Sequence, residues 1–268
     1  MIIKILGSGS AYGLPMCFNH WGEIKDRTLP YNQRSRFSVY LEDNGHKILI
    51  DMGPEFRLQT LANNITDIDG VFLTHGHYDH IAGVPELFRA AALLGKQINV
   101  YAAEETLAEL KRCYGYMFGT YQENGKDRIR WLEIKNGNNL IENMDWTCFE
   151  LPHNRIHSWG FRYKNFALVT DYDNLTQQVL DCLHGLDLLL LECNNGMQQV
   201  RNGHSNWIKI QPYLEQLQPQ KTILTHLSAK VDYESFKSLL PPQVDLAYDG
   251  METVSYTHLR AHETGRNL

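Results

Sequence analysis

The sequence contains no run of apolar residues long enough to span a bilayer, and it has no block of lysine and arginine. Its opening residues, MIIKILGSGSAYG, lack the basic segment and the long apolar core of a secretory signal. The formal net charge is −6, so the chain carries no electrostatic footprint for gripping long nucleic acid. These absences favour a cytoplasmic protein that binds no membrane and for which long nucleic acid is a poor partner.

Cysteine is sparse as well. The five cysteines are odd in number, widely scattered and never spaced as CxxC. This distribution argues against a disulfide framework and against a structural zinc site, and it fits a reducing compartment. The cysteines are Cys17, Cys113, Cys148, Cys182 and Cys193.

The 268 residues, of which 43% are hydrophobic, suffice for one large domain or two small ones. Strand-like runs such as KILIDM, VFLTH and LDLLLLE recur, and no internal repeat or linker interrupts them. The class is therefore α/β or α+β in packed layers. Apolar residues at helical spacing predict helices over Val84–Leu94, Glu104–Cys113, Leu175–Leu183, Ile208–Leu217 and Tyr233–Leu239.

Two segments differ from this alternating pattern. The stretch Pro15–Ser35 has little periodicity, and irregular segments of that length are usually functional or mobile. The end of the chain, VSYTHLRAHETGRNL, switches abruptly to a polar stretch that resembles translated adaptor DNA. We therefore expect one domain over residues 1–252 and a non-native or disordered tail over residues 253–268. His258 and His262 lie in that tail and are therefore not candidate metal ligands.

Polar residues fall where apolar strands end. Each of five such residues follows or closes a strand-like run, and ligands of layered α/β proteins bind outside the carboxyl ends of strands. The pattern predicts that these residues share one site. They are Asp51, His75, His153, Asp171 and His226.

The stretch THGHYDHIAG is the densest of these clusters. His75 and His77 are two residues apart and would face different sides of a helix, so we expect the ligands to lie on an irregular loop. A single catalytic zinc needs three protein ligands, and His153 is the natural third for His75 and His77. Asp79 and His80 are then left for a second metal ion.

That second ion is completed by His226, and the carboxylate of Asp171 can bridge both ions because it offers two oxygens. Two positions stay open. His157 competes with His153 for the third place, although it is expected to line the pocket or to form a hydrogen bond. Asp173 competes with Asp171, which lies directly at the strand end.

Two further residues have two readings each. Asp51 can orient a ligating histidine through its other ring nitrogen, or it can cap a turn. Ser228 can hydrogen-bond the substrate or stabilise a turn.

The ordered set THGHYDHIAG, LPH, VTD and LTHLS resembles the metallo-β-lactamase-fold hydrolases. This resemblance implies a four-layer αββα sandwich with a dinuclear site at one edge of its two sheets. It implies metal-ligand roles for His75, His77, Asp79, His80, His153, Asp171 and His226.

Within that superfamily the chain most resembles the phosphoribosyl 1,2-cyclic phosphate phosphodiesterases. The similarity rests on LGSGSAYGLP, LIDMGPEFR, LPHNRIHSWGFR, NGHSN, ILTHLS and AYDGM. It implies catalytic roles for His204, which would act near the scissile phosphate, and for Asp79. Many relatives carry a cysteine-based zinc site in the early loop, where this chain has only Cys17, so we expect no structural zinc.

The expected activity is hydrolysis of a small, cyclic phosphodiester by a hydroxide held between two divalent ions, Zn or Mn, with Fe as an alternative. The competing readings are a tRNA 3′-processing-type nuclease, a thioester or lactone hydrolase, and a non-catalytic metal-binding or cofactor-assembly protein. The segments Pro15–Ser35 and Cys113–Lys126 are expected to shape the substrate pocket. A homodimer is an open alternative to a monomer, since oligomeric state is not readable from the sequence.

Overall fold

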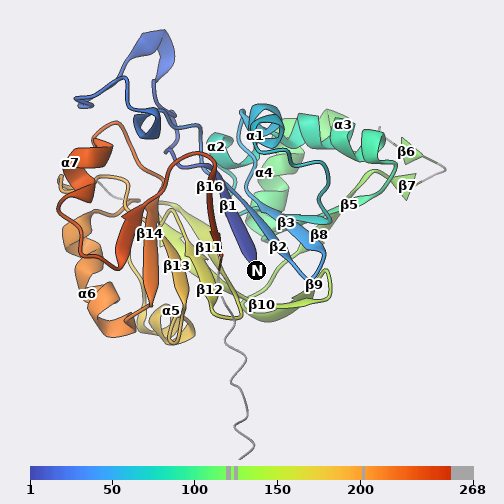
Figure 1. The fold of residues 1–268 in the computed structure, drawn as a ribbon. Helices are drawn as coiled ribbons and strands as arrows, with labels where there is room; N and C mark the ends of the chain where they lie inside the picture. The colour runs from blue at the N-terminus through green and yellow to red at the C-terminus, as the bar shows by residue number, and fades with distance from the viewer. Residues whose placement is uncertain (119–121, 124–125, 201–202, 255–268) are drawn as a thin grey trace, which may run out of the picture.

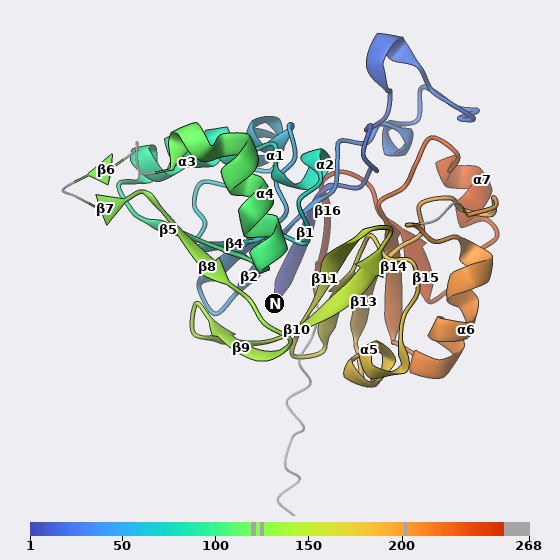
Figure 2. The ribbon, with the colours of Figure 1, turned by 180° about the vertical axis from the view of Figure 1, so that it is seen from behind.

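The computed structural model describes residues 1–118, 122–123, 126–200 and 203–254. In these residues two seven-stranded sheets pack face to face, and helices cover the outer face of each sheet (Figures 1 and 2). The expected αββα sandwich is confirmed.

The first sheet is built largely from the N-terminal half of the chain. Its strands β3, β4, β5 and β8 are parallel, and its other pairs are antiparallel. In spatial order the strands are β16 (Met251–Val254), β1 (Ile2–Gly7), β2 (Ser38–Asp43), β3 (His46–Ile50), β4 (Gly70–Phe72), β5 (Ile98–Ala102) and β8 (Ile129–Glu133).

The second sheet comes from the C-terminal half. Its strands β12 to β15 are parallel, and β9 to β12 form an antiparallel meander. In spatial order the strands are β15 (Val244–Leu246), β14 (Lys221–Thr225), β13 (Leu188–Glu192), β12 (Phe166–Val169), β11 (Ile156–Tyr163), β10 (Met144–His153) and β9 (Gly137–Ile141). A separate hairpin pairs β6 (Gln122–Glu123) with β7 (Lys126–Asp127).

The helices divide between the two outer faces. Those on the first sheet are α1 (Phe56–Ala62), α2 (Tyr78–Ile81), α3 (Val84–Leu94) and α4 (Glu104–Tyr114). Those on the second sheet are α5 (Gln177–Cys182), α6 (Trp207–Leu217) and α7 (Tyr233–Lys237). All five expected helices are present, and α3 has the expected bounds. The short helices α1 and α2 were not expected.

Three apolar layers hold these elements together: one between the sheets and one between each sheet and its helices. Aromatic rings fill the middle layer, where the ring of Phe72 lies 4.8 Å from that of Trp146 and 4.6 Å from that of Phe161, measured between centroids. Both sheets contribute to this layer, so their packing fixes how their edges meet.

The segment Pro15–Ser35 is irregular, as expected, with two short 3₁₀ turns, η1 (Cys17–Asn19) and η2 (Pro30–Asn32). The buried guanidinium of Arg34 anchors it, because Nη2 donates to the carbonyl of Val231 at 2.7 Å and Nη1 donates to that of Ser228 at 3.2 Å. A third 3₁₀ turn, η3 (Gly115–Met117), follows α4.

Strand β16 runs two residues past the expected domain boundary at residue 252. Thr253 pairs with Ile3 and Val254 with Ile2, so both belong to the first sheet and not to the tail. Residues 255–268 lie outside the described residues. No helix in the described part of the chain is long and apolar enough to cross a membrane.

Candidate metal centre

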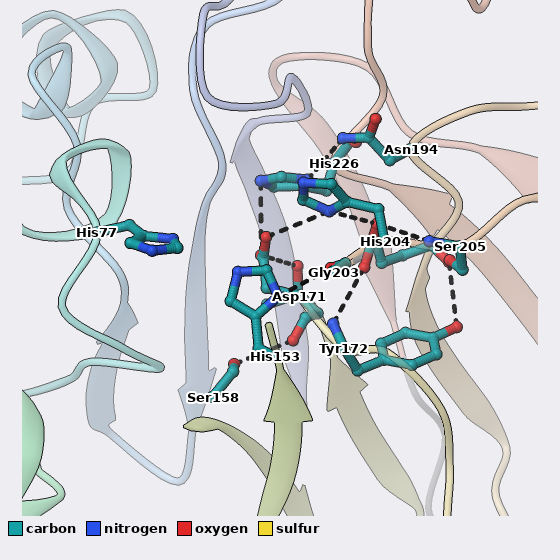
Figure 3. A network of polar contacts seen from close by, with 12 residues as sticks. His77, His153, Ser158, Asp171, Tyr172, Asn194, Gly203, His204, Ser205 and His226 are labelled. Atoms are coloured by element: carbon teal, nitrogen blue, oxygen red, sulfur yellow. Dashed lines mark hydrogen bonds and ion pairs between the residues drawn. The ribbon is translucent and has the colours of Figure 1, made fainter. Parts of the chain in front are cut away.

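The strand-end residues meet at one edge of the sandwich, and each sheet supplies part of the cluster. Asp51 follows β3 and His75 follows β4 in the first sheet, whereas His153 ends β10, and Asp171 and His226 follow β12 and β14 in the second. Figure 3 shows His77 on one side of the cluster, opposite His153, Asp171 and His226.

Three of these strands end in the same unusual backbone conformation. Asp51, Asp171 and His226 have φ of 60°, 53° and 56°, in the left-handed region that non-glycine residues seldom occupy. Residues of this kind cluster at functional sites, where surrounding contacts hold them in place. Here the left-handed residue turns each chain sharply as it leaves the sheet.

The stretch THGHYDHIAG is only partly the loop that we expected. His75 and His77 lie in the irregular segment after β4, but Asp79 and His80 are on the short helix α2. The expectation was therefore wrong for Asp79 and His80. The single turn of α2 points Asp79 and His80 in directions that differ from those of His75 and His77. The cluster therefore receives donors from the irregular segment and from the helix.

The donor atoms form groups that match the two expected ligand sets. One ring nitrogen from each of His75, His77 and His153 lies within 4.8 Å of the others. The same holds for one donor each from Asp79, His80 and His226. Asp171 forms a further group with His75 and His80, and another with His204 and His226, so it lies between the two sets.

The chemistry of the donors fits a cation. The Asp51 carboxylate accepts a hydrogen bond from the Nδ1 atom of His80 at 2.7 Å, so Nε2 carries the lone pair whenever the ring is neutral. The Nε2 atoms of His80 and His226 are buried and have no hydrogen-bond partner among the described residues. Each faces carboxylate oxygens of Asp79 and Asp171 at 3.1–3.5 Å. Lone pairs converging with carboxylates in a buried site are the arrangement that a divalent ion satisfies.

The electrostatics of the cluster also favour positive charge. Burial lowers the pKa of His80, but the nearby carboxylates of Asp79, Asp51 and Asp171 outweigh it and hold that pKa well above the ordinary value. Burial raises the pKa of Asp171, yet the surrounding histidines, His226 and His80 foremost, hold it well below the usual range.

The histidines of the other set behave in the opposite way. Burial, reinforced by neighbouring imidazoles, lowers the pKa of His75 well below its ordinary value. Burial lowers the pKa of His153 too. Neutral imidazole is the form in which histidine ligates metals, so these rings are held ready for ligation.

His204 lies at the rim of the cluster with 29% of its side chain exposed. Its Nδ1 atom is 3.0 Å from a carboxylate oxygen of Glu192, the buried last residue of β13. Burial lowers the pKa of His204, but the hydrogen bond and charge of Glu192 raise it to about 9.

Glu192 was missed in the sequence. Its side chain is fully buried, and it also accepts from the backbone amide of Ser205 at 3.2 Å, which fixes the loop that carries His204. The available signal was its position, since it closes the apolar run LDLLLLE as the other site residues close theirs.

The structure separates the competing aspartates. The carboxylate of Asp173 accepts from the backbone amides of Asn154 and Gly203, at 2.6 and 2.5 Å, and so ties two loops together beside the cluster. Asp171, the expected ligand, is the one among the histidines.

His157 does not reach the cluster, so of its two expected roles it does not line the pocket there, and its polar contacts lie elsewhere. It pairs with Pro152 across the β10–β11 hairpin and therefore points to the face opposite that of His153. Its exposed ring lies 3.4 Å from a carboxylate oxygen of Glu150 and 3.7 Å from one of Glu105.

Asp51 and Ser228 make well-defined contacts. Asp51 accepts from the amide and the hydroxyl of Thr74, each at 2.8 Å, in addition to its contact with His80. It thus both closes the turn after β4 and orients His80. The hydroxyl of Ser228 donates to the carbonyl of Asn194 at 2.7 Å, a contact that stabilises the turn.

Comparison with known proteins agrees with this geometry. The model of the beta-lactamase superfamily domain matches residues 46–227, and the chain belongs to that family. A crystal structure of a diphosphatase from the PhnP family superposes with a TM-score of 0.85 at 25% identity, covering 95% of this chain and 98% of that one. The resemblance to metallo-β-lactamase-fold hydrolases related to PhnP is thereby confirmed.

Two curated relatives show how varied the family is. An octanoyltransferase of Porphyromonas gingivalis is 27% identical over 258 residues, or 93% of this chain and 51% of that protein. The exodeoxyribonuclease WalJ of Streptococcus pneumoniae is 25% identical over 179 residues, or 63% of this chain and 62% of that protein. The chain thus spans about half the length of the first relative and less than two thirds of the second. The chain thus shares the fold of this family, and its described residues include histidine and aspartate groups that could hold divalent ions.

Proposed function

We propose that the protein is a dinuclear metal-dependent phosphodiesterase that acts on a small, cyclic phosphodiester. The observation that carries the proposal is the meeting of two three-donor groups at one shared carboxylate, that of Asp171. His75, His77 and His153 would hold one ion and Asp79, His80 and His226 the other, with Asp171 contacting both. The ions would be Zn or Mn, with Fe as an alternative, because histidine and carboxylate ligands accept all three.

Two divalent ions at this site would lower the pKa of water and neutralise the charge that builds on a phosphoryl group. The chain itself supplies the positioning. Asp51 holds the ring of His80, and Gly203 accepts from the Nδ1 atom of His153 at 2.8 Å, so both histidines present Nε2 to the centre. Asp79 belongs to the second donor group, so it would bind an ion that takes part in the reaction and is in that sense also a catalytic residue.

His204 has a different task from the ligands. Glu192 accepts from its Nδ1 atom, which leaves Nε2 for the substrate. From the rim of the cluster, that nitrogen can protonate the departing alkoxide or donate a hydrogen bond to a phosphate oxygen. Support from a relative comes from the PhnP-family diphosphatase, whose named activity also breaks a bond to phosphorus.

The test is turnover by the purified protein, stripped of metal and reloaded with Mn or Zn. Bis(p-nitrophenyl) phosphate and a panel of cyclic phosphodiesters report phosphodiesterase activity. The panel also includes substrates for the alternative functions. A pre-tRNA and single-stranded DNA test for a nuclease, and a thioester and a lactone test for carbonyl hydrolysis. Metal-dependent hydrolysis of the small diesters supports the proposal. Turnover of only the other substrates, or no turnover by fully loaded protein, contradicts it.

A further inference from the structure

A pocket lies against the irregular N-terminal segment, and its volume of about 610 Å³ is within the usual size range of small-molecule sites. The irregular N-terminal segment forms most of its wall, with residues 12–17 on one side and residues 33–36 on the other, and Glu55 and Asp249 complete it. Figures 1 and 2 show this segment rising next to α2, where the two sheets meet. None of the expected ligands lines this pocket.

Arg36 links the pocket to the metal centre. Gly9 bridges both to Arg36 and to Leu227, the residue after His226. Phe37, the next residue, lies under the cluster, with its ring centroid 6.0 Å from that of His80. Since neighbouring residues of an extended chain point to opposite faces, Arg36 lies on the pocket side of the same segment.

The guanidinium of Arg36 contacts one exposed tyrosine and the backbone just before another. It lies over the ring of Tyr78, with its carbon 5.9 Å from the ring centroid, and its Nε atom donates to the carbonyl of Ala11 at 2.8 Å. Tyr12 follows Ala11 directly, so this hydrogen bond fixes the backbone at the start of Tyr12. Tyr78 is 62% exposed and Tyr12 is 73% exposed, although aromatic side chains of this size are normally covered.

Side chains with unused hydrogen-bond donors and acceptors lie at the wall of the pocket that contains Arg36. Arg36 is fixed by an ion pair between its Nη1 atom and Glu55, and its Nη2 atom makes no hydrogen bond with the described residues. The Oε2 atom of Glu55 is buried and also has no hydrogen-bond partner among the described residues. The exposed amide side chain of Gln33 makes no hydrogen bond within the described part of the chain. Donors and acceptors of both kinds next to flat rings are the features that recognise a planar heterocycle.

We propose that this pocket binds the nucleobase of a nucleoside phosphodiester whose phosphate lies at the metal centre. Tyr12 and Tyr78 provide the stacking surfaces, and Gln33, Glu55 and Arg36 face the polar edge of the base. Tyr78 stands between the candidate ligands His77 and Asp79 in the chain, which links its ring to the site of the phosphate. The inference rests on the proposed phosphodiesterase function and names its substrate class.

The experiment compares two esters that differ only in the base. Thymidine 5′-(p-nitrophenyl phosphate) and its abasic counterpart both release p-nitrophenolate, so the same chemical step is measured for each. Stacking of one base on an aromatic side chain corresponds to roughly a 5- to 150-fold effect. We therefore expect kcat/KM of the metal-loaded protein to favour the thymidine ester by about that factor.

Variants assign the preference to the tyrosines. Tyr12→Leu and Tyr78→Leu should each reduce the ratio of the two kcat/KM values at least about 5-fold, whereas Tyr12→Phe and Tyr78→Phe, which keep a ring, should preserve it. Leu140→Ala is the matched control, because Leu140 is a 73% exposed side chain on β9, at the other end of the sandwich from the pocket. It should keep the wild-type ratio.

A ratio near one in the wild-type protein, or a ratio that the leucine variants leave unchanged, overturns the nucleobase pocket while the phosphodiesterase proposal stands. If neither ester is turned over, the panel of small diesters still decides on the phosphodiesterase proposal, and calorimetry decides on the pocket. Tighter binding of thymidine 5′-phosphate than of 2-deoxyribose 5-phosphate, lost in Tyr78→Leu, supports the pocket. Equal affinities overturn it.

Discussion

Asp51 offers the sharpest test of how the fold prepares its donors, and the change to make is Asp51→Asn. The side chain is fully buried and accepts three hydrogen bonds: from the amide of Thr74 and its hydroxyl, each at 2.8 Å, and from Nδ1 of His80 at 2.7 Å. Asparagine has the same shape. It also tolerates the left-handed backbone of this position, where φ is 60°, so the fold of the turn is preserved.

The amide cannot reproduce the hydrogen bonds. In one orientation its NH₂ group faces the proton on Nδ1 of His80, and in the other it faces the amide proton of Thr74. The first conflict is relieved if His80 moves its proton to Nε2, the atom that faces the cluster, and that tautomer cannot bind a metal through Nε2. Loss of such a supporting contact typically costs about 10- to 100-fold in metal affinity, or about 1.4 to 2.8 kcal/mol.

The assay is a competition titration against a chromophoric chelator, which resolves two binding constants. We expect Asp51→Asn to weaken the ion bound by His80 and to affect the other ion much less. Asp43→Asn is the matched control, since Asp43 is also a buried carboxylate but lies at the far end of β2, where it accepts from Tyr163 of the second sheet. Equal metal affinities for both variants and the wild type would refute the orienting role and leave Asp51 as a turn cap.

Three further predictions concern the rim, the shared carboxylate and the far end of the sandwich. His204→Ala should reduce kcat about 100- to 10,000-fold with metal content near wild type, and loss of metal would instead make His204 a ligand. Asp171→Ala should lower occupancy at both positions in elemental analysis, and a fully loaded variant would remove its bridging role. Burial raises the pKa of Asp43, but the hydrogen bonds from Lys164 and Tyr163 hold it below the usual range. The stability from Asp43 is therefore complete above about pH 4, the pKa of an unfolded aspartate, and is lost as the pH falls through the lower folded value. Asp43→Asn should lower the free energy of unfolding by about 1–3 kcal/mol at pH 7 and by progressively less below pH 4, and a constant difference in chemical denaturation across that range would contradict this account.

The sequence predicted the parts of the fold that local rules determine. The apolar spacing predicted helix α3 with the right bounds, and the structure shows the local causes: Pro85 lies in its first turn, and Gly95 ends it in the left-handed conformation, with φ of 65°. The strand-end residues were found because each follows or closes an apolar run, and His77, Asp79 and His80 were found because they crowd directly after His75. Helix α2 is a single turn, too short for a periodic pattern to emerge. Helix α1 was missed although it is longer than α5 and α7.

The remaining features depend on contacts between distant segments. The face of His157 follows from the register of the β10–β11 hairpin, which the residue spacing alone left open. Glu192 looks like the end of an apolar strand until the fold brings His204 to it. The pocket beside Arg36 forms only where an irregular segment packs against α1 and against the strand end at His226, and no local pattern encodes that arrangement.

The division of the donors between the sheets has a consequence for folding. Each expected ligand set takes two residues from the first sheet and one from the second, and Asp171 adds a second-sheet oxygen to both. A folding chain that has formed only one sheet therefore lacks a complete set for either ion. The free energy of metal binding becomes available only after the two sheets have docked, and it then stabilises the native state alone. Metal uptake would thus distinguish a finished molecule from a half-assembled one.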